Sequence, residues 1–282
     1  MSAPSPTSPE QVGLRHARQP LQRILTRSGI DDAEASAHRG ARAMAPALAA
    51  LALAREIVDP WDGLIHRRCR IAPAPHSSAH PRPPRLRRTA RSGWELIEVT
   101  VELSAEVAAD GAPSTPPPQA WPVLQVRHDL ARRPLPAPEG ADPLSTASAV
   151  GAAPTDATCP AHGSHGSHNA ASGRRLILTG DDLAAWASAT GDDNPIHLVL
   201  GAARRAGLAA EEDGVVAHGL LLAALSLGLV PADPRHEGLD LLFPAALAVG
   251  RPGAALIVDE RGSCWSAVGK RRVLRRQGAS TR

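Results

Sequence analysis

A carboxylate, an amide and an imidazole follow one another closely in segment 191–197, which reads GDDNPIH. Asp192 and His197 lie five positions apart, and each side chain can take up or release a proton. Two such groups facing one water molecule or hydroxyl can move protons at adjacent carbons. The residue types therefore indicate elimination of water from, or addition of water to, a carbon pair that a carbonyl group activates.

A second element of this chemistry begins at His218 and Gly219. These residues open an apolar run, 220–230, which predicts a buried helix. The first N–H groups of a helix have no partner within the helix, and they lie at the positive end of its dipole. A carbonyl oxygen that gains negative charge during the reaction would be stabilised by such donors.

The segment before Asp192 predicts how that residue is held. Apolar residues at helical spacing indicate a short helix over 181–189, and Gly191 ends it. Pro195 disfavours helix at Asn194, so we expect Asp192 and His197 to lie on a shaped loop after the helix.

The two motifs, GDDNPIH at 191–197 and VVAHGLL at 215–221, resemble the signature of the MaoC-like (R)-specific enoyl-thioester hydratases and 3-hydroxyacyl-thioester dehydratases, which have the hot-dog fold. The resemblance covers 172–275 clearly. It implies a hydro-lyase of fatty-acid metabolism with Asp192 and His197 as the catalytic pair. It also implies three substrate-binding residues: Asn194, which helps to position the pair, Gly219, whose N–H binds the thioester carbonyl, and His218, whose main role is to present Gly219.

The same resemblance implies the substrate and the assembly. The substrate would be a 2-enoyl or 3-hydroxyacyl thioester of coenzyme A or of an acyl carrier protein, and no cofactor or metal would be needed. A homodimer and a heteromer both remain open, as do the acyl chain length and the pathway. The segment 207–218 is longer than usual and carries Glu211, Glu212 and Asp213, and Val199 stands where relatives often have an acidic residue.

Composition limits the other classes of function. The chain has 282 residues, a formal charge of +3 and three widely spaced cysteines, Cys69, Cys159 and Cys264. An odd number of distant cysteines argues against a disulfide framework and favours a reducing compartment. The longest early apolar run is far below the ~20 residues that span a bilayer, so we expect a cytoplasmic protein without a membrane span. The basic clusters 82–91 and 270–276 lack interleaved aromatic residues, which argues against binding of nucleic acid. We interpret these clusters as solvated loops and strand ends. The alternative is that one of them contacts the phosphates of coenzyme A or the surface of an acidic carrier protein.

The order of predicted elements suggests two similar halves. In the first half, a helix at 45–58 is followed by strands at 64–71, 94–107 and 123–130. The second half opens with a strand at 174–178. Its helix after His218 is followed by strands at 239–249, 254–259, 262–268 and 271–275. We therefore predict an α+β double hot-dog, with an antiparallel sheet wrapped around a central helix in each half. The expected divisions are a polar segment 1–40, a non-catalytic half 41–133, a linker 134–172 and a catalytic half 173–277.

The linker carries a second group of residues with metal-binding side chains. Its stretch HGSHGSH, 162–168, places three histidines at three-residue spacing. Imidazoles bind zinc, nickel and copper, but a Gly/Ser-rich tract does not hold them in a fixed geometry, so we interpret the stretch as solvated.

Two other polar residues, Asp193 and Ser226, and two other functions are compatible with the same motifs. Asp193 is interpreted as facing solvent or capping a helix, and Ser226 as bonding back to its own helix rather than orienting Asp192. A hot-dog acyl thioesterase would use the same fold on similar substrates. A non-catalytic, acyl-thioester-binding subunit of a heteromeric dehydratase would account for the acidic insertion and for Val199.

Overall fold

The computed structural model describes residues 9–74, 81–104, 123–133, 173–232 and 238–278. The predicted linker 134–172, with its three histidines and Cys159, lies outside the described residues. Within them, no helix combines the length and the apolar character needed to cross a membrane.

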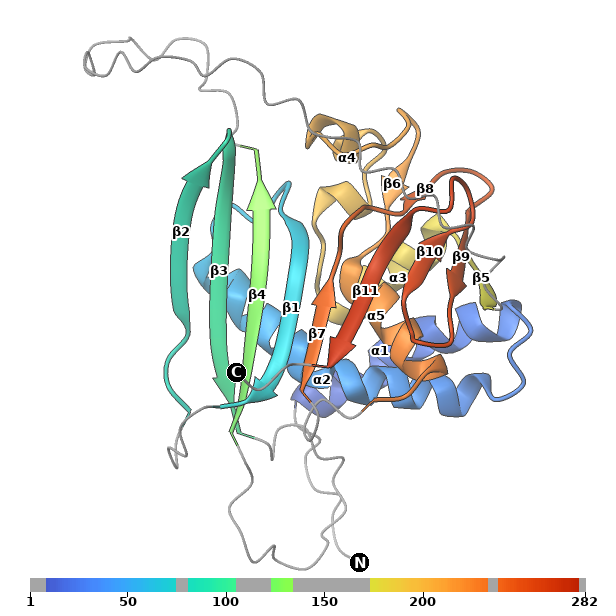
Figure 1. Cartoon of the computed structure of the whole chain (residues 1–282), viewed down its shortest axis with the longest axis horizontal. Coiled ribbons are helices and arrows are strands. Elements are labelled where there is room, and N and C mark those ends of the chain that lie inside the picture. The colour runs from blue at the N-terminus through green and yellow to red at the C-terminus, as the bar shows by residue number, and fades with distance from the viewer. Residues whose placement is uncertain (1–8, 75–80, 105–122, 134–172, 233–237, 279–282) are drawn as a thin grey trace, which may run out of the picture.

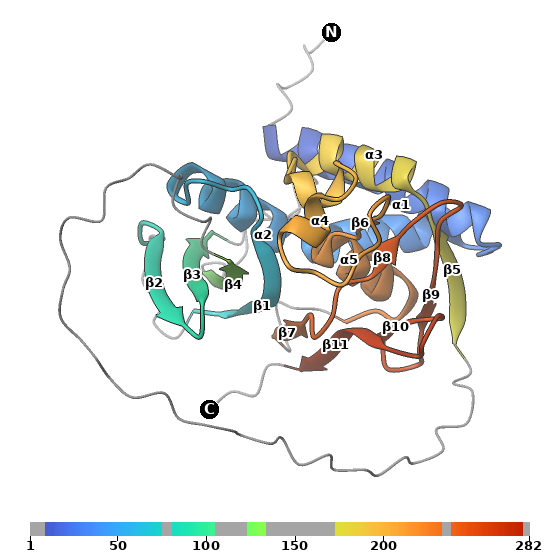
Figure 2. The same cartoon turned by 90° about the horizontal axis from the view of Figure 1, so that it is seen from above.

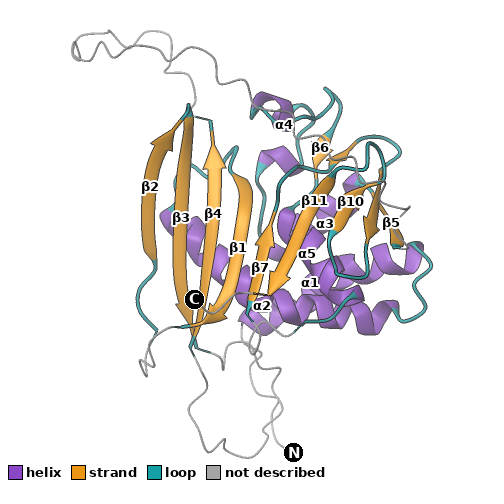
Figure 3. Ribbon diagram, in the orientation of Figure 1, coloured by secondary structure: helices purple, strands orange, loops and turns teal. Residues whose placement is uncertain are grey.

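The described residues form an α+β fold in which helices cover one side of a curved antiparallel sheet (Figures 1, 2 and 3). The helices are α1 (Pro9–Arg27), α2 (Ala33–Ile57), α3 (Gly180–Thr190), α4 (Ala202–Arg205) and α5 (Gly219–Leu229). The main strands are β1 (Ile65–Pro73), β2 (Arg85–Arg91), β3 (Trp94–Leu103), β4 (Leu124–Arg132), β5 (Arg174–Leu178), β7 (Leu239–Leu242), β9 (Ala254–Val258), β10 (Cys264–Ser266) and β11 (Arg272–Gly278).

These nine strands make one sheet in the order β2-β3-β4-β1-β7-β11-β10-β9-β5. The first four strands follow α2 in the chain and the other five accompany α5. The two groups join where β1 pairs with β7, from Arg68 opposite Leu242 to Ile71 opposite Leu239. A separate pair, β6 (Val215–Val216) and β8 (Ala248–Val249), lies beside α4.

The two long buried helices, α2 and α5, touch through glycines. A Cβ atom on Gly40 would lie 2.2 Å from the carbonyl oxygen of Ala224, and one on Gly228 would lie 2.5 Å from that of Ser36. The backbones can therefore approach this closely only because both positions lack a side chain. Arg39 adds a polar contact by donating to the carbonyl of Gly228 from Nε and from one terminal nitrogen, at 3.2 and 3.1 Å.

Helix α2 is longer than the predicted helix 45–58, because it begins at Ala33. Small residues, Ala33, Ala37 and Ala41, recur every four positions on its buried side. Such small residues give a weak hydrophobic signal, so hydrophobic periodicity does not reveal this part of the helix. Most of the remaining predicted strands are found within a few residues of their expected bounds, as β1, β3, β4, β5, β9, β10 and β11.

Two predictions for strands were wrong in part. The predicted strand 239–249 is broken into β7 and β8, since Pro244 has no N–H to continue a ladder. We expected solvated loop and strand ends in the basic segment 82–91, but Arg85–Arg91 is an edge strand, β2, held by backbone pairing with β3. Every residue of β2 is exposed, so hydrophobic periodicity could not reveal it.

Candidate active site

Asp192 is placed by the end of α3. The N-terminus of this helix is fixed by Asp182, whose carboxylate accepts the backbone N–H and the hydroxyl of Thr179, each at 2.8 Å. The helix ends at Gly191, which has a left-handed φ of 73° that a glycine adopts without strain. The turn directs the chain inward, so that Asp192 is buried although it follows a helix terminus.

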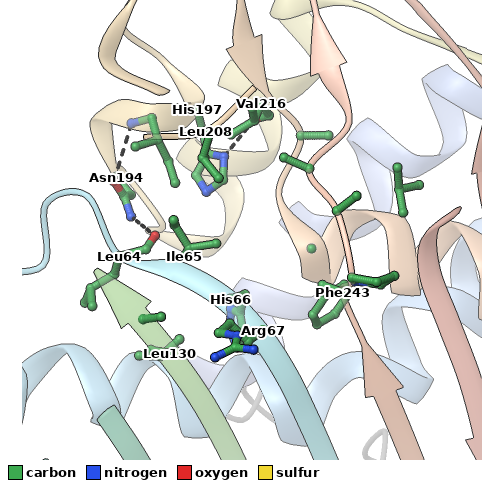
Figure 4. Close-up of a pocket in the computed structure, with 18 of the residues that line it drawn as sticks. Leu64, Ile65, His66, Arg67, Leu130, Asn194, His197, Leu208, Val216 and Phe243 are labelled. Atoms are coloured by element: carbon green, nitrogen blue, oxygen red, sulfur yellow. Dashed lines mark hydrogen bonds between the residues drawn. The ribbon is translucent and has the colours of Figure 1, made fainter. Parts of the chain in front are cut away.

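Asn194 fastens the motif to the N-terminal half of the chain. Its Nδ2 donates to the carbonyl of Leu64 at 2.8 Å (Figure 4). Its Oδ1 accepts from the N–H of Gly63 at 3.2 Å. The same oxygen accepts from the N–H of Ile196 at 3.4 Å and caps the short 3-10 turn Pro195–His197. Both ends of the amide are thus engaged with backbone groups.

His197 is held in one tautomer. Its Nδ1 lies 2.7 Å from the carbonyl oxygen of Val216, which can only accept, so Nδ1 carries the proton and Nε2 presents a lone pair. Burial lowers the pKa of His197, and the nearby Asp192 carboxylate and the Val216 carbonyl partly oppose this shift. The imidazole is therefore neutral at pH 7 and can accept a proton.

His218 lies directly against His197. The two rings stack with centroids 3.7 Å apart and an angle of 24° between their planes. His218 Nε2 donates to the backbone carbonyl of Asp192 at 3.1 Å. Burial and the neighbouring His197 keep the pKa of His218 well below its usual value. A neutral His218 thus supports both members of the predicted pair, one through its backbone and the other by stacking.

The motif residues from two distant segments converge on one point. A carboxylate oxygen of Asp192, a ring nitrogen of His197 and a ring nitrogen of His218 all lie within 4.8 Å of one another. Two histidines and a carboxylate can hold a metal ion when their lone pairs converge. The two stacked imidazoles are nearly parallel, so their in-plane lone pairs do not converge on one ion. The geometry suits proton exchange better than metal binding.

Trp61 is a site residue that the sequence did not reveal. Its indole N–H donates to Oδ1 of Asp192 at 3.1 Å. Trp61 lies in the turn between α2 and β1, and the same turn supplies Gly63 and Leu64 to Asn194. Residues 59–63, DPWDG, have the composition of a turn, but nothing in the sequence indicates which residue the turn contacts.

Gly219 begins α5, as predicted, and lines the same pocket as Asp192 and His197. His218 precedes it with extended backbone angles and gives no side-chain cap, so the first N–H groups of the helix are left for another acceptor. A Cβ on Gly219 would lie 3.1 Å from the ring of Phe243. A side chain at this position would therefore require the ring or the helix terminus to shift by a few tenths of an ångström.

The pocket has a volume of about 550 Å³ and both halves of the chain line it (Figure 4). Apolar residues make up much of the wall, among them Leu64, Ile65, Leu96, Leu130, Ile196, Leu208, Leu222 and Leu247. His66 contributes a polar group from β1, and its Nε2 lies 2.9 Å from Nδ1 of the buried His128. Burial lowers the pKa of both rings, that of His128 to about 4. The site is thus a pocket whose wall combines apolar side chains with polar ones, Asp192 and His197 among them.

Other residues considered in the sequence lie away from this point. Asp193 is exposed and forms an ion pair with Arg55. Ser226 donates to the carbonyl of Gly262 at 2.5 Å, so it bonds neither to its own helix nor to Asp192. In the acidic segment, Glu212 pairs with Arg204 on the surface. Cys69 and Cys264 are free thiols in the core, where burial raises their pKa.

No protein-family model and no curated protein matches the sequence. Among solved structures, a MaoC-like dehydratase is similar over 93% of this chain and 91% of its own, with a TM-score of 0.53 and 19% identity. Others are the peroxisomal multifunctional enzyme type 2 of Drosophila melanogaster (TM-score 0.49, 13% identity, 91% of this chain and 45% of that one) and HtdX of Mycobacterium tuberculosis (TM-score 0.45, 13% identity, 92% and 93%). The first likeness confirms the expected resemblance at the level of the fold, which is that of a MaoC-like dehydratase.

Proposed function

We propose that this chain, which has the fold of a MaoC-like dehydratase, is a hydro-lyase that hydrates 2-enoyl thioesters and dehydrates 3-hydroxyacyl thioesters with (R) specificity. One observation carries the proposal: the Asp192 carboxylate and a ring nitrogen of His197 lie within 4.8 Å of each other in a pocket that Gly219 also lines. A carbonyl-binding donor and an acid–base pair are what the reaction needs.

In the proposed mechanism, the thioester carbonyl accepts a hydrogen bond from the N–H of Gly219. As water adds to C3, negative charge develops on this oxygen, and the helix terminus stabilises it. Asp192 and His197 hold the water, take one proton from it and deliver a proton to C2. Dehydration is the same sequence in reverse, so no group is consumed.

Asn194 and His218 act as positioning residues in this proposal. Asn194 ties the loop to the backbone of Gly63 and Leu64, and His218 holds the Asp192 carbonyl and stacks on His197. His218 also precedes Gly219 and so sets the start of α5.

We propose further that the chain is a double hot-dog. In this interpretation α2 with β1–β4 forms one unit and α5 with β5 and β7–β11 the other, joined by the β1–β7 pairing and by the close contact of the two helices. The expected boundary between a first segment 1–40 and a half 41–133 falls inside α2, so the first half begins with this helix at Ala33. That half carries no acid–base pair, and the other proposed divisions are a linker 134–172 and a catalytic half 173–277. The first half supplies Trp61 to Asp192 and half of the pocket wall, which gives it a role without catalytic residues of its own.

The direct test is an absorbance assay of the purified chain with trans-2-enoyl thioesters of graded acyl length, carried by coenzyme A or by an acyl carrier protein. The proposal predicts loss of the enoyl absorbance and an (R)-3-hydroxy product. Release of free thiol without hydration would instead indicate the thioesterase alternative.

A non-catalytic subunit of a heteromeric dehydratase is the other alternative. It predicts that the pure chain binds an enoyl thioester without hydrating it, and that a second protein restores turnover. The oligomeric state, a homodimer or a heteromer, is read from the mass of the native particle in the same preparation.

A further inference from the structure

The main sheet opens beside the candidate active site. Pairing of β1 with β7 ends at Arg68 and Leu242, and the next contact is a single bond of 2.9 Å from the N–H of Phe243 to the carbonyl of Arg67. Pro244 follows and cannot donate to a ladder. The two strands therefore separate here, and the active-site pocket is lined by residues from both sides of the opening, including Ile65 and Ala245.

Arg67 is the extra residue of a β-bulge at this opening. In the β1–β4 ladder, His66 pairs with Leu130 and Arg68 with Asp129, so Arg67 has no partner on β4. A bulge bends its strand and redirects a side chain, and bulges are frequent next to active sites. Arg67 lies three residues beyond Leu64, which contacts Asn194, and thus roughly 10 Å further along the strand.

Arg67 also lines a second cavity, of about 710 Å³. The two cavities share five residues: Arg67, Leu96, Leu130, Phe243 and Pro244. On the far side of the second cavity, Arg87 and Thr89 contribute from alternate positions of the edge strand β2. A substrate that occupies the active-site pocket could therefore extend past Arg67 toward Arg87.

The charges in this second cavity do not balance. Arg68 pairs with Asp240, with Nε 2.7 Å from Oδ1, and Arg127 pairs with Asp129 at 2.7 Å and with Glu98 at 2.9 Å. These contacts neutralise two of the four arginines that line the cavity. Arg67 and Arg87 form no ion pair with any residue that the structure describes, and both are exposed.

We propose that Arg67 and Arg87 bind an anionic group of the thioester substrate. The inference rests on the proposed function, because it assumes that the thioester lies at Gly219. A guanidinium presents paired donors that match either a phosphate or a carboxylate. The anion is therefore a phosphate of the carrier arm or a carboxylate on the acyl group. In the first case the arginines matter for coenzyme A substrates, and in the second for substrates with a carboxylated acyl group.

The test uses Arg67→Gln and Arg87→Gln, with Arg85→Gln as the matched control. Arg85 is an exposed arginine of the same strand but lines neither cavity. Calorimetry measures the Kd of coenzyme A and of a saturated dicarboxylic half-thioester of N-acetylcysteamine, which lacks phosphate. Kinetics measure KM for three enoyl thioesters: a coenzyme A thioester, an N-acetylcysteamine thioester, and the latter with a terminal carboxylate.

We expect each cavity variant to raise Kd and KM about tenfold for the probes that carry the recognised anion, while Arg85→Gln changes them less than twofold. An effect limited to coenzyme A probes identifies a phosphate, and one limited to the carboxylated probes identifies a carboxylate. If Kd and KM for every probe are the same in both cavity variants as in the wild type, the anion subsite is overturned. The proposed function still stands in that case, provided that the wild type hydrates enoyl thioesters.

Binding and turnover separate the two proposals. Binding that depends on Arg67, without hydration of any enoyl thioester, would retain the anion subsite and remove the hydro-lyase. A wild-type chain that neither binds nor hydrates any of these probes would overturn both.

Discussion

The indole N–H of Trp61 donates a hydrogen bond of 3.1 Å to the carboxylate of Asp192, which lies 131 positions later in the chain. The donor belongs to the turn between α2 and β1, and the acceptor to the loop after α3. The proposed catalytic half therefore depends on the other half for the orientation of its acid.

Replacing Trp61 by Phe tests this dependence. The variant keeps an aromatic ring beside Arg55 but removes the donor to a charged group, a bond worth about 1.5–3 kcal/mol. We expect kcat for enoyl-thioester hydration to fall about tenfold or more, while circular dichroism shows an intact fold. Trp94→Phe is the control, because Trp94 lines the same pocket and its ring contacts Arg133. If kcat falls equally in Trp61→Phe and Trp94→Phe, the loss comes from a changed pocket shape and not from the hydrogen bond to Asp192.

The acid–base pair is tested by Asp192→Asn and His197→Ala. Each change should lower turnover by roughly 10²-fold or more, since a positioned acid or base contributes about that much, while circular dichroism shows an intact fold. Asp193→Asn is a matched control on the neighbouring exposed carboxylate and should retain turnover. Near-normal hydration of a crotonyl thioester by either pair variant would refute the assignment.

Gly219→Ala tests the carbonyl-binding terminus. The added Cβ would meet the ring of Phe243 at 3.1 Å, so ring and helix terminus must shift by a few tenths of an ångström. We expect kcat to fall by about tenfold, because oxyanion donors work only when positioned before the reaction. Adding Phe243→Leu relieves the contact and should restore part of the loss. No recovery in the double variant would mean that the contact with Phe243 is not the cause.

Acid should destabilise the fold through His128, which is buried and lies 2.9 Å from a ring nitrogen of His66. Burial lowers the pKa of His128 from about 6.5 to about 4, so the native state favours the neutral ring. A lowered histidine pKa gives stability that is complete above about pH 6.5 and is lost as the pH falls toward 4. The loss for His128 is on the order of 3 kcal/mol. Denaturant unfolding between pH 7 and 4 should show a shallower decline for His128→Asn than for the wild type, and parallel declines would contradict this assignment.

The contact of α2 with α5 predicts opposite effects at two glycines. Gly40→Ala would place a Cβ 2.2 Å from the Ala224 carbonyl, so the helices must separate, at a cost of about 1–3 kcal/mol. Gly180→Ala, in the first turn of α3, meets no atom within 4 Å and should be neutral or stabilising. Thermal unfolding of both variants measures the difference. A Gly40→Ala chain as stable as the wild type would mean that the close approach is not required.

The sequence was sufficient where the signal is local. The end of α3 at Gly191 and the start of α5 at Gly219 follow from turn chemistry and apolar runs, and both are found where they were predicted. The break after Leu242 could have been anticipated from Pro244, but the apolar residues on either side suggested one strand. Strand β2 was missed because an edge strand with every residue exposed carries no hydrophobic pattern.

The sequence by itself determined which groups could do the chemistry, because GDDNPIH and the apolar helix after His218 fix residue types and local turns. Only the tertiary structure decided which residues contact these groups. Trp61 donates a hydrogen bond to Asp192, His218 stacks on His197, and Arg67 lies in a β-bulge at the opening of the sheet. These contacts join segments that are far apart in the chain. Their partners are set by strand order and helix packing, and no local propensity encodes either.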